Sequence, residues 1–120
     1  NSLVATNNAT GNTSGLNIAN NTNSSVILNG ITNLINSSTS PTTSRVYFGN
    51  RGDITCNNLL NISNSSTSTN SQIYCNHAVN STGLYNDNVV LENTNASSDG
   101  ILFGNGNGNG NGGCPPPEPE

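Results

Sequence analysis

Residues 53–63 read Asp-Ile-Thr-Cys-Asn-Asn-Leu-Leu-Asn-Ile-Ser, and this stretch decides the fold class. Four of its apolar residues occupy even positions, with Asn58 as the polar exception among these positions: Ile54, Cys56, Leu60 and Ile62. A period of two residues places alternate side chains on opposite faces of a strand, so one face is apolar and the other polar. The stretch therefore predicts β-structure with one buried face.

Similar short strands recur along the chain. Apolar units followed by Gly or Asn begin at Val26, Val46, Ile73 and Ile101, with spacings of 20, 27 and 28 residues, and Val89-Val90-Leu91 adds another. The segments between them are rich in Asn, Ser, Thr, Gly and Pro, which favour turns. This pattern predicts an all-β chain, either a β-solenoid or an intertwined β-fibre, with a small β-sandwich filament subunit as the alternative.

The composition excludes several classes of protein. The 120 residues include 27 Asn, 16 Ser, 13 Thr and 13 Gly, and only 30% are hydrophobic and 7% charged. Two Arg and no Lys cannot form a basic face for nucleic acid, and the longest apolar runs are too short for a membrane span. Because β-branched residues are frequent, we expect strands around a thin core, with disorder as the open alternative.

Three segments divide the chain. Residues 1–103 form an Asn/Ser/Thr-rich β-domain, residues 104–113 a Gly/Asn tract, and residues 114–120 a Cys-Pro-Glu tail with the character of a hinge. The tract has no side chains for a core, so it is interpreted as a flexible linker or as an ordered Asn ladder. The start at Asn1, without a leader-like segment, favours a mature product or a fragment.

Nine Asn-x-Ser/Thr sequons are candidate glycosylation sites: Asn8, Asn12, Asn20, Asn23, Asn36, Asn61, Asn64, Asn80 and Asn95. The richness in Asn, Ser and Thr produces nearly as many by chance. A weakly charged chain with a thin core nevertheless needs another source of solubility, which glycans would supply. We therefore expect N-linked glycans on several of these sites.

Three cysteines are candidates for crosslinks. Cys56 and Cys75 both lie on expected strands, and a disulfide between them would stabilise the fold by about 3 kcal/mol. Cys114, before three prolines, is expected to join neighbouring chains; in an alternative arrangement all three cysteines link subunits. Disulfides would place the protein outside the cell.

Two further motifs are weaker. Arg51-Gly52-Asp53 spells an integrin-type attachment tripeptide, although a Gly-Asp turn before a strand explains the same letters. His77 is the only imidazole, and its combination with Cys56 and Cys75 lacks the paired spacing of a zinc site. We expect no metal, no cofactor and no catalytic residues, because neither a nucleophile elbow nor a carboxylate pair is present.

One family resemblance adds to this interpretation. Gly52–Ser63 begins Gly-Asp-Ile-Thr and continues with several Asn and Leu residues, and Ser81–Leu91 is similar. Both segments resemble repeats in the tail and surface fibres of phages and large DNA viruses. The resemblance covers residues 45–104 and implies an elongated, often trimeric β-fibre.

The sequence thus predicts a non-enzymatic, extracellular or virion- or cell-surface structural protein. We expect a subunit or segment of a self-assembling, glycosylated fibre or surface filament, whose partners are copies of itself and N-linked glycans. Two alternatives remain. One is a receptor- or carbohydrate-binding adhesin module. The other is a donor-strand pilin, whose donated segment would contain Leu3, Val4, Leu16 and Ile18.

Overall fold

The computed structural model describes residues 2–78, 80–94 and 100–104, which form eleven strands and no helix. The strands are β1 Leu3–Asn7, β2 Thr13–Ile18, β3 Ser25–Leu28, β4 Thr32–Asn36, β5 Thr43–Phe48, β6 Asp53–Cys56, β7 Leu60–Asn64, β8 Asn70–Cys75, β9 Gly83–Tyr85, β10 Val89–Asn93 and β11 Gly100–Phe103. The predicted all-β class is confirmed. The hinge-like tail 114–120 and the Gly/Asn tract after Gly104 lie outside the described residues.

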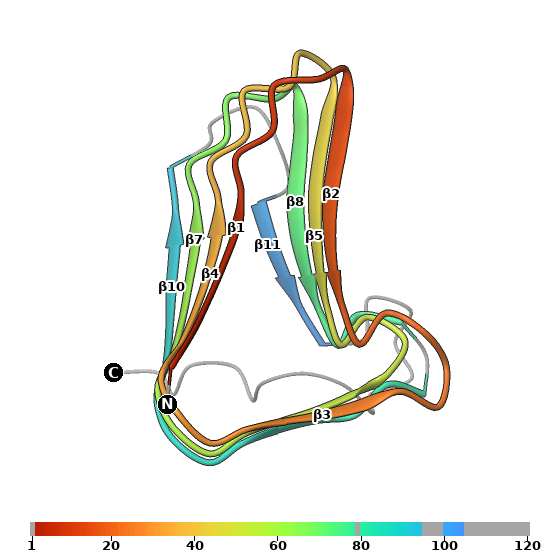
Figure 1. Ribbon diagram of the computed structural model, residues 1–120, viewed down its shortest axis with the longest axis vertical. Helices are drawn as coiled ribbons and strands as arrows, with labels where there is room; N and C mark the ends of the chain where they lie inside the picture. The colour runs from red at the N-terminus through yellow and green to blue at the C-terminus, as the bar shows by residue number, and fades with distance from the viewer. Residues whose placement is uncertain (1, 79, 95–99, 105–120) are drawn as a thin grey trace.

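The strands wind into a β-solenoid, as one of the alternatives predicted. Each of the first three coils contributes one strand to each of three parallel sheets, named A (β1-β4-β7-β10), B (β2-β5-β8-β11) and C (β3-β6-β9); the described part of the fourth coil contributes β10 and β11. Figure 1 looks along the stack and shows the three sheets as the sides of a triangle. All the described strand pairs are parallel and lie within one chain, unlike those of an intertwined fibre or an antiparallel sandwich.

The register corrects the repeat expected from the apolar units. Val46, Ile73 and Ile101 do stack on one another in sheet B, at the expected spacings. Val26 instead pairs with Ile54 in sheet C, and the sheet-B residue of the first coil is Leu16. The sequence pattern grouped Val26 of sheet C with residues of sheet B. It did so because the corners after both sheets contain Asn or Gly directly after an apolar residue.

The core consists of the inward-facing residues of the second and third coils: Leu34, Val46, Phe48, Ile54, Cys56, Leu60, Ile62, Ile73 and Cys75. Every even apolar position predicted within residues 53–63 is among them. Ile54 and Cys56 belong to β6 in sheet C, whereas Leu60 and Ile62 belong to β7 in sheet A. The alternating stretch therefore spans two sheets and the corner between them.

A left-handed residue turns the chain after every strand of sheet B. Ala19, Gly49, Asn76 and Gly104 occupy this position, with φ of 49°, 63°, 46° and 79°. Glycine and asparagine tolerate this conformation best, which explains three of the four residues. At Gly49 a Cβ atom would also lie only 2.4 Å from Cγ1 of Ile54. This corner therefore restricts both backbone and side chain.

Candidate functional site

The most ordered polar feature is a ladder of amides inside the solenoid. Asn7, Asn36, Asn64 and Asn93 are in register at the ends of the sheet-A strands. Each of the first three donates from Nδ2 to Oδ1 of the next, at 3.0 Å in every case. The donors all point the same way, so the ladder has a direction along the axis.

Serines of sheet B complete the hydrogen bonding of the buried amides. Ser44 donates to Oδ1 of Asn36 at 2.6 Å, and Ser71 donates to Oδ1 of Asn64 at 2.8 Å. Asn36 also donates to Oγ of Ser71 at 3.0 Å. Asn36 and Asn64 are both 0% exposed, and their buried polar atoms are therefore paired as burial requires.

Two further ladders run along the outside. Asn61 donates to Asn33 at 2.9 Å on the outer face of sheet A. At the corner between sheets C and A, Asn86 donates to Asn57 and Asn57 to Asn29, both at 2.7 Å. In these ladders the donors point toward the first coil, opposite to the internal one.

The internal ladder was not predicted from the sequence, although the sequence contains a signal for it. The pentapeptide Asn-Ser-Ser-Thr-Ser occurs at residues 36–40 and again at residues 64–68. The interval of 28 residues equals the in-register step from Asn36 to Asn64. In the structure Ser38, Ser40, Ser66 and Ser68 are all buried behind these strands. Polar repeats, more than apolar ones, mark the length of the coil.

Two of the nine predicted glycosylation sites belong to this ladder. Asn36 and Asn64 lie inside the solenoid, and their Nδ2 atoms, to which a glycan would be attached, donate hydrogen bonds there. No space exists for a sugar at either position in this fold. We therefore expect no glycan on either residue in the folded chain.

The other sequons lie nearer the surface. Asn8, Asn12, Asn23 and Asn80 are exposed in corner segments, Asn20 and Asn61 are half-buried, and Asn95 lies outside the described residues. Asn61 also donates its Nδ2 to the outer ladder. The exposed four are the sites at which a glycan meets no packing obstacle.

Cys56 and Cys75 are buried, and no disulfide joins them. Cys56 is stacked in register between Leu28 and Tyr85 in sheet C, and Cys75 between Phe48 and Phe103 in sheet B. Each sulfur thus occupies a rung of an apolar stack. Burial raises the pKa of the Cys56 thiol to about 11, which disfavours the reactive thiolate. Cys114 lies outside the described residues.

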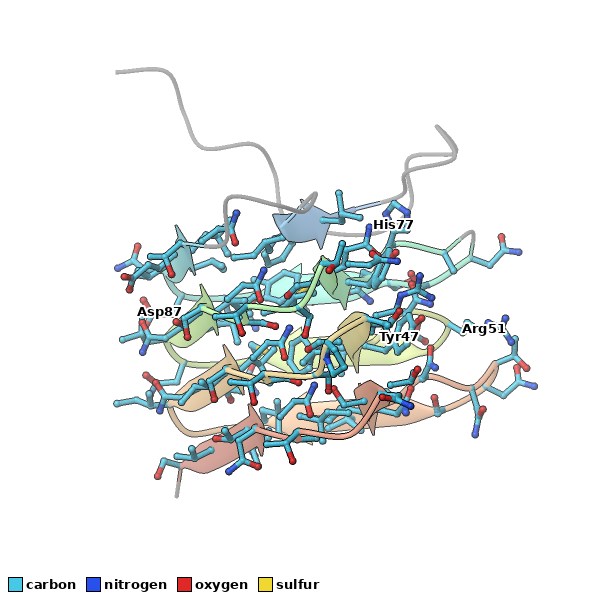
Figure 2. The ribbon with its side chains drawn as sticks, turned by 90° about the horizontal axis from the view of Figure 1, so that it is seen from above. Tyr47, Arg51, His77 and Asp87 are labelled. Carbon is cyan, nitrogen blue, oxygen red and sulfur yellow. The ribbon has the colours of Figure 1, made fainter. Side chains whose placement is uncertain are left out.

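Arg51, Gly52 and Asp53 form a tight corner between sheets B and C. Arg51 is exposed and points away from the stack, as Figure 2 shows. Gly52 is buried where a Cβ atom would meet backbone oxygens of Ala19 and Ser24 at 2.7 Å. Oδ1 of Asp53 accepts a hydrogen bond from the backbone N–H of Thr82 at 3.0 Å. Glycine and aspartate at this corner thus have structural roles.

An aromatic row runs along the outer face of sheet B. The rings of Tyr47 and Tyr74 stack with centroids 5.1 Å apart, and Tyr74 contacts His77 at 5.2 Å. Nη1 of Arg45 donates to the Tyr47 hydroxyl at 3.4 Å, and this hydrogen bond raises the pKa of Arg45. The row combines aromatic rings with a guanidinium group on one half-buried surface.

The first coil has an open face. β1, β2 and β3 are each the edge strand of their sheet. Leu3, Val4, Leu16 and Ile18, considered as a donated segment, form β1 and β2 of the chain's own first coil.

In the described part of the chain, no three His, Cys, Asp or Glu side chains gather as a metal site would require, and no helix is long and apolar enough to cross a membrane. Comparison with protein-family models, curated proteins and solved structures finds no match. Function is therefore inferred from the geometry alone.

Proposed function

We propose that this chain is a structural subunit or segment of an extracellular, self-assembling and glycosylated filament. The proposal rests on the stacking of identical residues in successive coils along one axis. Asn36 stacks on Asn64, Ser44 on Ser71, and Tyr47 on Tyr74, each at successive coils. Because each coil contacts only its neighbours, such a stack is extended by adding coils without rearranging those present.

The distribution of charge and sequons supports the same function. The chain contains two Arg and six acidic residues, too few to solubilise a long filament by charge. The exposed sequons Asn8, Asn12, Asn23 and Asn80 lie in corner segments. Glycans there would coat the sides of the triangle and leave the stacking axis clear.

Electron microscopy and sedimentation of the 120-residue chain test this function. We expect unbranched filaments whose diffraction contains a reflection at roughly 4.8 Å along the filament axis, since coils stack at the strand spacing. A chain that remains a folded monomer at micromolar concentration would contradict the proposal.

A carbohydrate- or receptor-binding module is the second candidate, favoured by the aromatic row. Tyr47, Tyr74 and His77 with Arg45 offer ring edges and donors suited to a sugar. Tyrosine fluorescence during titration with oligosaccharides tests this function. A saturable change that disappears in Tyr74→Ser, with the Tyr85→Phe variant as the control away from the row, would support it.

A further inference from the structure

The open face of the first coil presents backbone groups from three strands at once. The N–H of Leu3 donates to Ile31, and the carbonyl of Asn7 accepts from Ser37, so these residues bond toward the second coil. In a parallel ladder the intervening residues point the other way. Backbone N–H and C=O groups of β1, β2 and β3 therefore face outward along the axis, including those of Val4, Thr6, Gly15, Asn17 and Ile27.

The residues of the first coil include none of the groups that usually protect an edge strand. Natural edge strands are usually blocked by Pro, Lys or other charges. The first proline of this chain is Pro41 and its first charged side chain is Arg45, so the whole first coil contains neither. An edge of this kind favours the addition of another strand.

The apolar residues of the first coil are covered on one side only. Leu16 and Ile18 are partly buried, whereas Val46 and Phe48, one coil further along, are 0% exposed. The fourth coil has a matching feature: Leu91 is 48% exposed, although Ile62 below it in the same stack is 1% exposed. Each end thus presents an apolar rung that a further coil would cover.

The amide ladders give the open face a polarity. Asn7 donates from Nδ2 to Asn36, and its Oδ1 accepts no hydrogen bond from the described residues. Asn29 accepts from Asn57, and its Nδ2 donates to none of the described residues. The face therefore offers an acceptor at the corner between sheets A and B and a donor at the corner between sheets C and A.

We propose that the first coil binds the fourth coil of a second copy of this chain, head to tail. This placement puts β10 of the second copy beside β1 and β11 beside β2, both parallel. Val89, Leu91 and Asn93 would then continue the stacks of Leu3, Ala5 and Asn7, as the register of the internal coils dictates. A head-to-head copy would reverse the strands and break these stacks. This inference rests on the proposed filament function and specifies its contact.

The same register gives a charge test of the contact. One row on the outer face of sheet A contains, in successive coils, Thr6, Ile35, Ser63 and Glu92. A head-to-tail contact therefore brings Glu92 of the second copy next to Thr6 of the first. Both side chains are exposed in the single chain, which keeps substitutions there away from the core. Like charges on adjacent strands are unfavourable and opposite charges favourable.

Four variants and the wild-type chain test the proposal by sedimentation and electron microscopy. In Thr6→Pro the ring replaces an N–H that the single chain does not use, and we expect the critical concentration for assembly to rise about tenfold. Thr6→Val retains that N–H and should assemble as the wild type does. Thr6→Glu should weaken assembly, and Glu92→Lys in the same chain should restore it, with both effects smaller at high salt.

The outcomes separate the inference from the proposed function. A wild-type chain that never assembles overturns both. Wild-type filaments that are unchanged in Thr6→Pro and Thr6→Glu would leave the filament function in place and overturn the first-coil contact. Weakening by Thr6→Glu without rescue by Glu92→Lys would overturn the head-to-tail register. Circular dichroism below the assembly concentration verifies folding; if Thr6→Pro does not fold, the Thr6→Glu and Glu92→Lys pair decides.

Discussion

At the scale of single residues, the side chain that dominates this protein is asparagine, and its effect depends on which face it occupies. The amide of Asn64 is buried and forms hydrogen bonds with Asn36, Ser71 and Asn93. The amide of Asn61, three residues earlier on β7, is half-buried. The same residue type is therefore a core group at one position and a surface group at the other. Burial, rather than hydrogen-bond length, should determine what each contributes.

Asn64→Ala should therefore lower the free energy of unfolding by about 2–4 kcal/mol, because it leaves the buried donor of Asn36 and the hydroxyl of Ser71 without their acceptor. Asn61→Ala removes a ladder bond of similar length in contact with water and should cost less than about 1 kcal/mol. Urea unfolding of chains produced without glycosylation measures both. Equal losses would contradict the assignment of the internal ladder as a stabilising core.

Cys56 makes a prediction about pH. Its pKa is raised to about 11 by burial, so the folded chain holds the thiol proton more tightly than the unfolded chain does. The corresponding stability is fully present below about pH 9, the ordinary value, and is lost as the pH rises through about 11. Urea midpoints between pH 8 and pH 11, roughly the range of thiol titration, should decline less in Cys56→Val. Tyr85, the neighbour of Cys56 in sheet C, is retained in that control, and identical declines would refute the prediction.

At the scale of elements, the corners decide how strands of similar composition are assigned to different sheets. The corner after sheet B uses a left-handed residue in every coil, and its segment varies in length and carries Arg51 and His77. The corner after sheet C is shorter and is held by the ladder of Asn29, Asn57 and Asn86. Regular corners keep the coils in register, while the variable corner accommodates insertions without disturbing the stack.

Gly49 tests the importance of the left-handed corner. Alanine at this position would combine a positive φ of 63° with a Cβ atom 2.4 Å from Cγ1 of Ile54. We expect Gly49→Ala to cost more than about 2 kcal/mol, measured by thermal or urea unfolding. Gly11→Ala is the matched control, because no atom lies within 4 Å of its added Cβ, and it should change stability by less than about 1 kcal/mol. A tolerated Gly49→Ala would contradict the role of this corner.

At the scale of the whole molecule, the solenoid separates three kinds of surface. The sides carry the aromatic row and the outer ladder of Asn33 and Asn61, the corners carry exposed sequons, and the first coil presents an open edge. Figure 2 shows the coils as layers, with Arg51 and Asp87 projecting at opposite corners. Modification at the corners and growth along the axis are therefore compatible with each other.

Glycopeptide mass spectrometry of folded material secreted from a glycosylating host tests the surface assignment. We expect glycans at Asn8, Asn12, Asn23 and Asn80, and none at Asn36 or Asn64, whose amides are enclosed. A glycan on either buried residue of the folded protein would refute the internal ladder. A bare chain from that host would instead remove the glycoprotein part of the proposed function.

Local pattern was sufficient for the class of fold. The alternation at Ile54, Cys56, Leu60 and Ile62 predicts strands with one buried face because side chains alternate across a strand whatever its partners are. Long apolar segments and helix-forming segments are scarce, so the few hydrophobic residues are buried most readily by strands with one apolar face. The all-β class and the inward faces were therefore determined by the sequence itself.

Only the tertiary structure decided which strands stack and which polar residues are internal. Val26 and Val46 carry similar local sequences, yet the corners send them to different sheets. Asn36 and Asn61 are both sequons, yet Asn36 is enclosed because Asn7, Asn64 and Ser71 of neighbouring coils, together with Ser44 of its own coil, complete its hydrogen bonds. Three of these four partners are about one coil or more away in sequence, and a buried amide is stable only when all its partners are in place. Local sequence propensity does not show whether these partners will meet. Which asparagines are buried is therefore decided by how the coils stack.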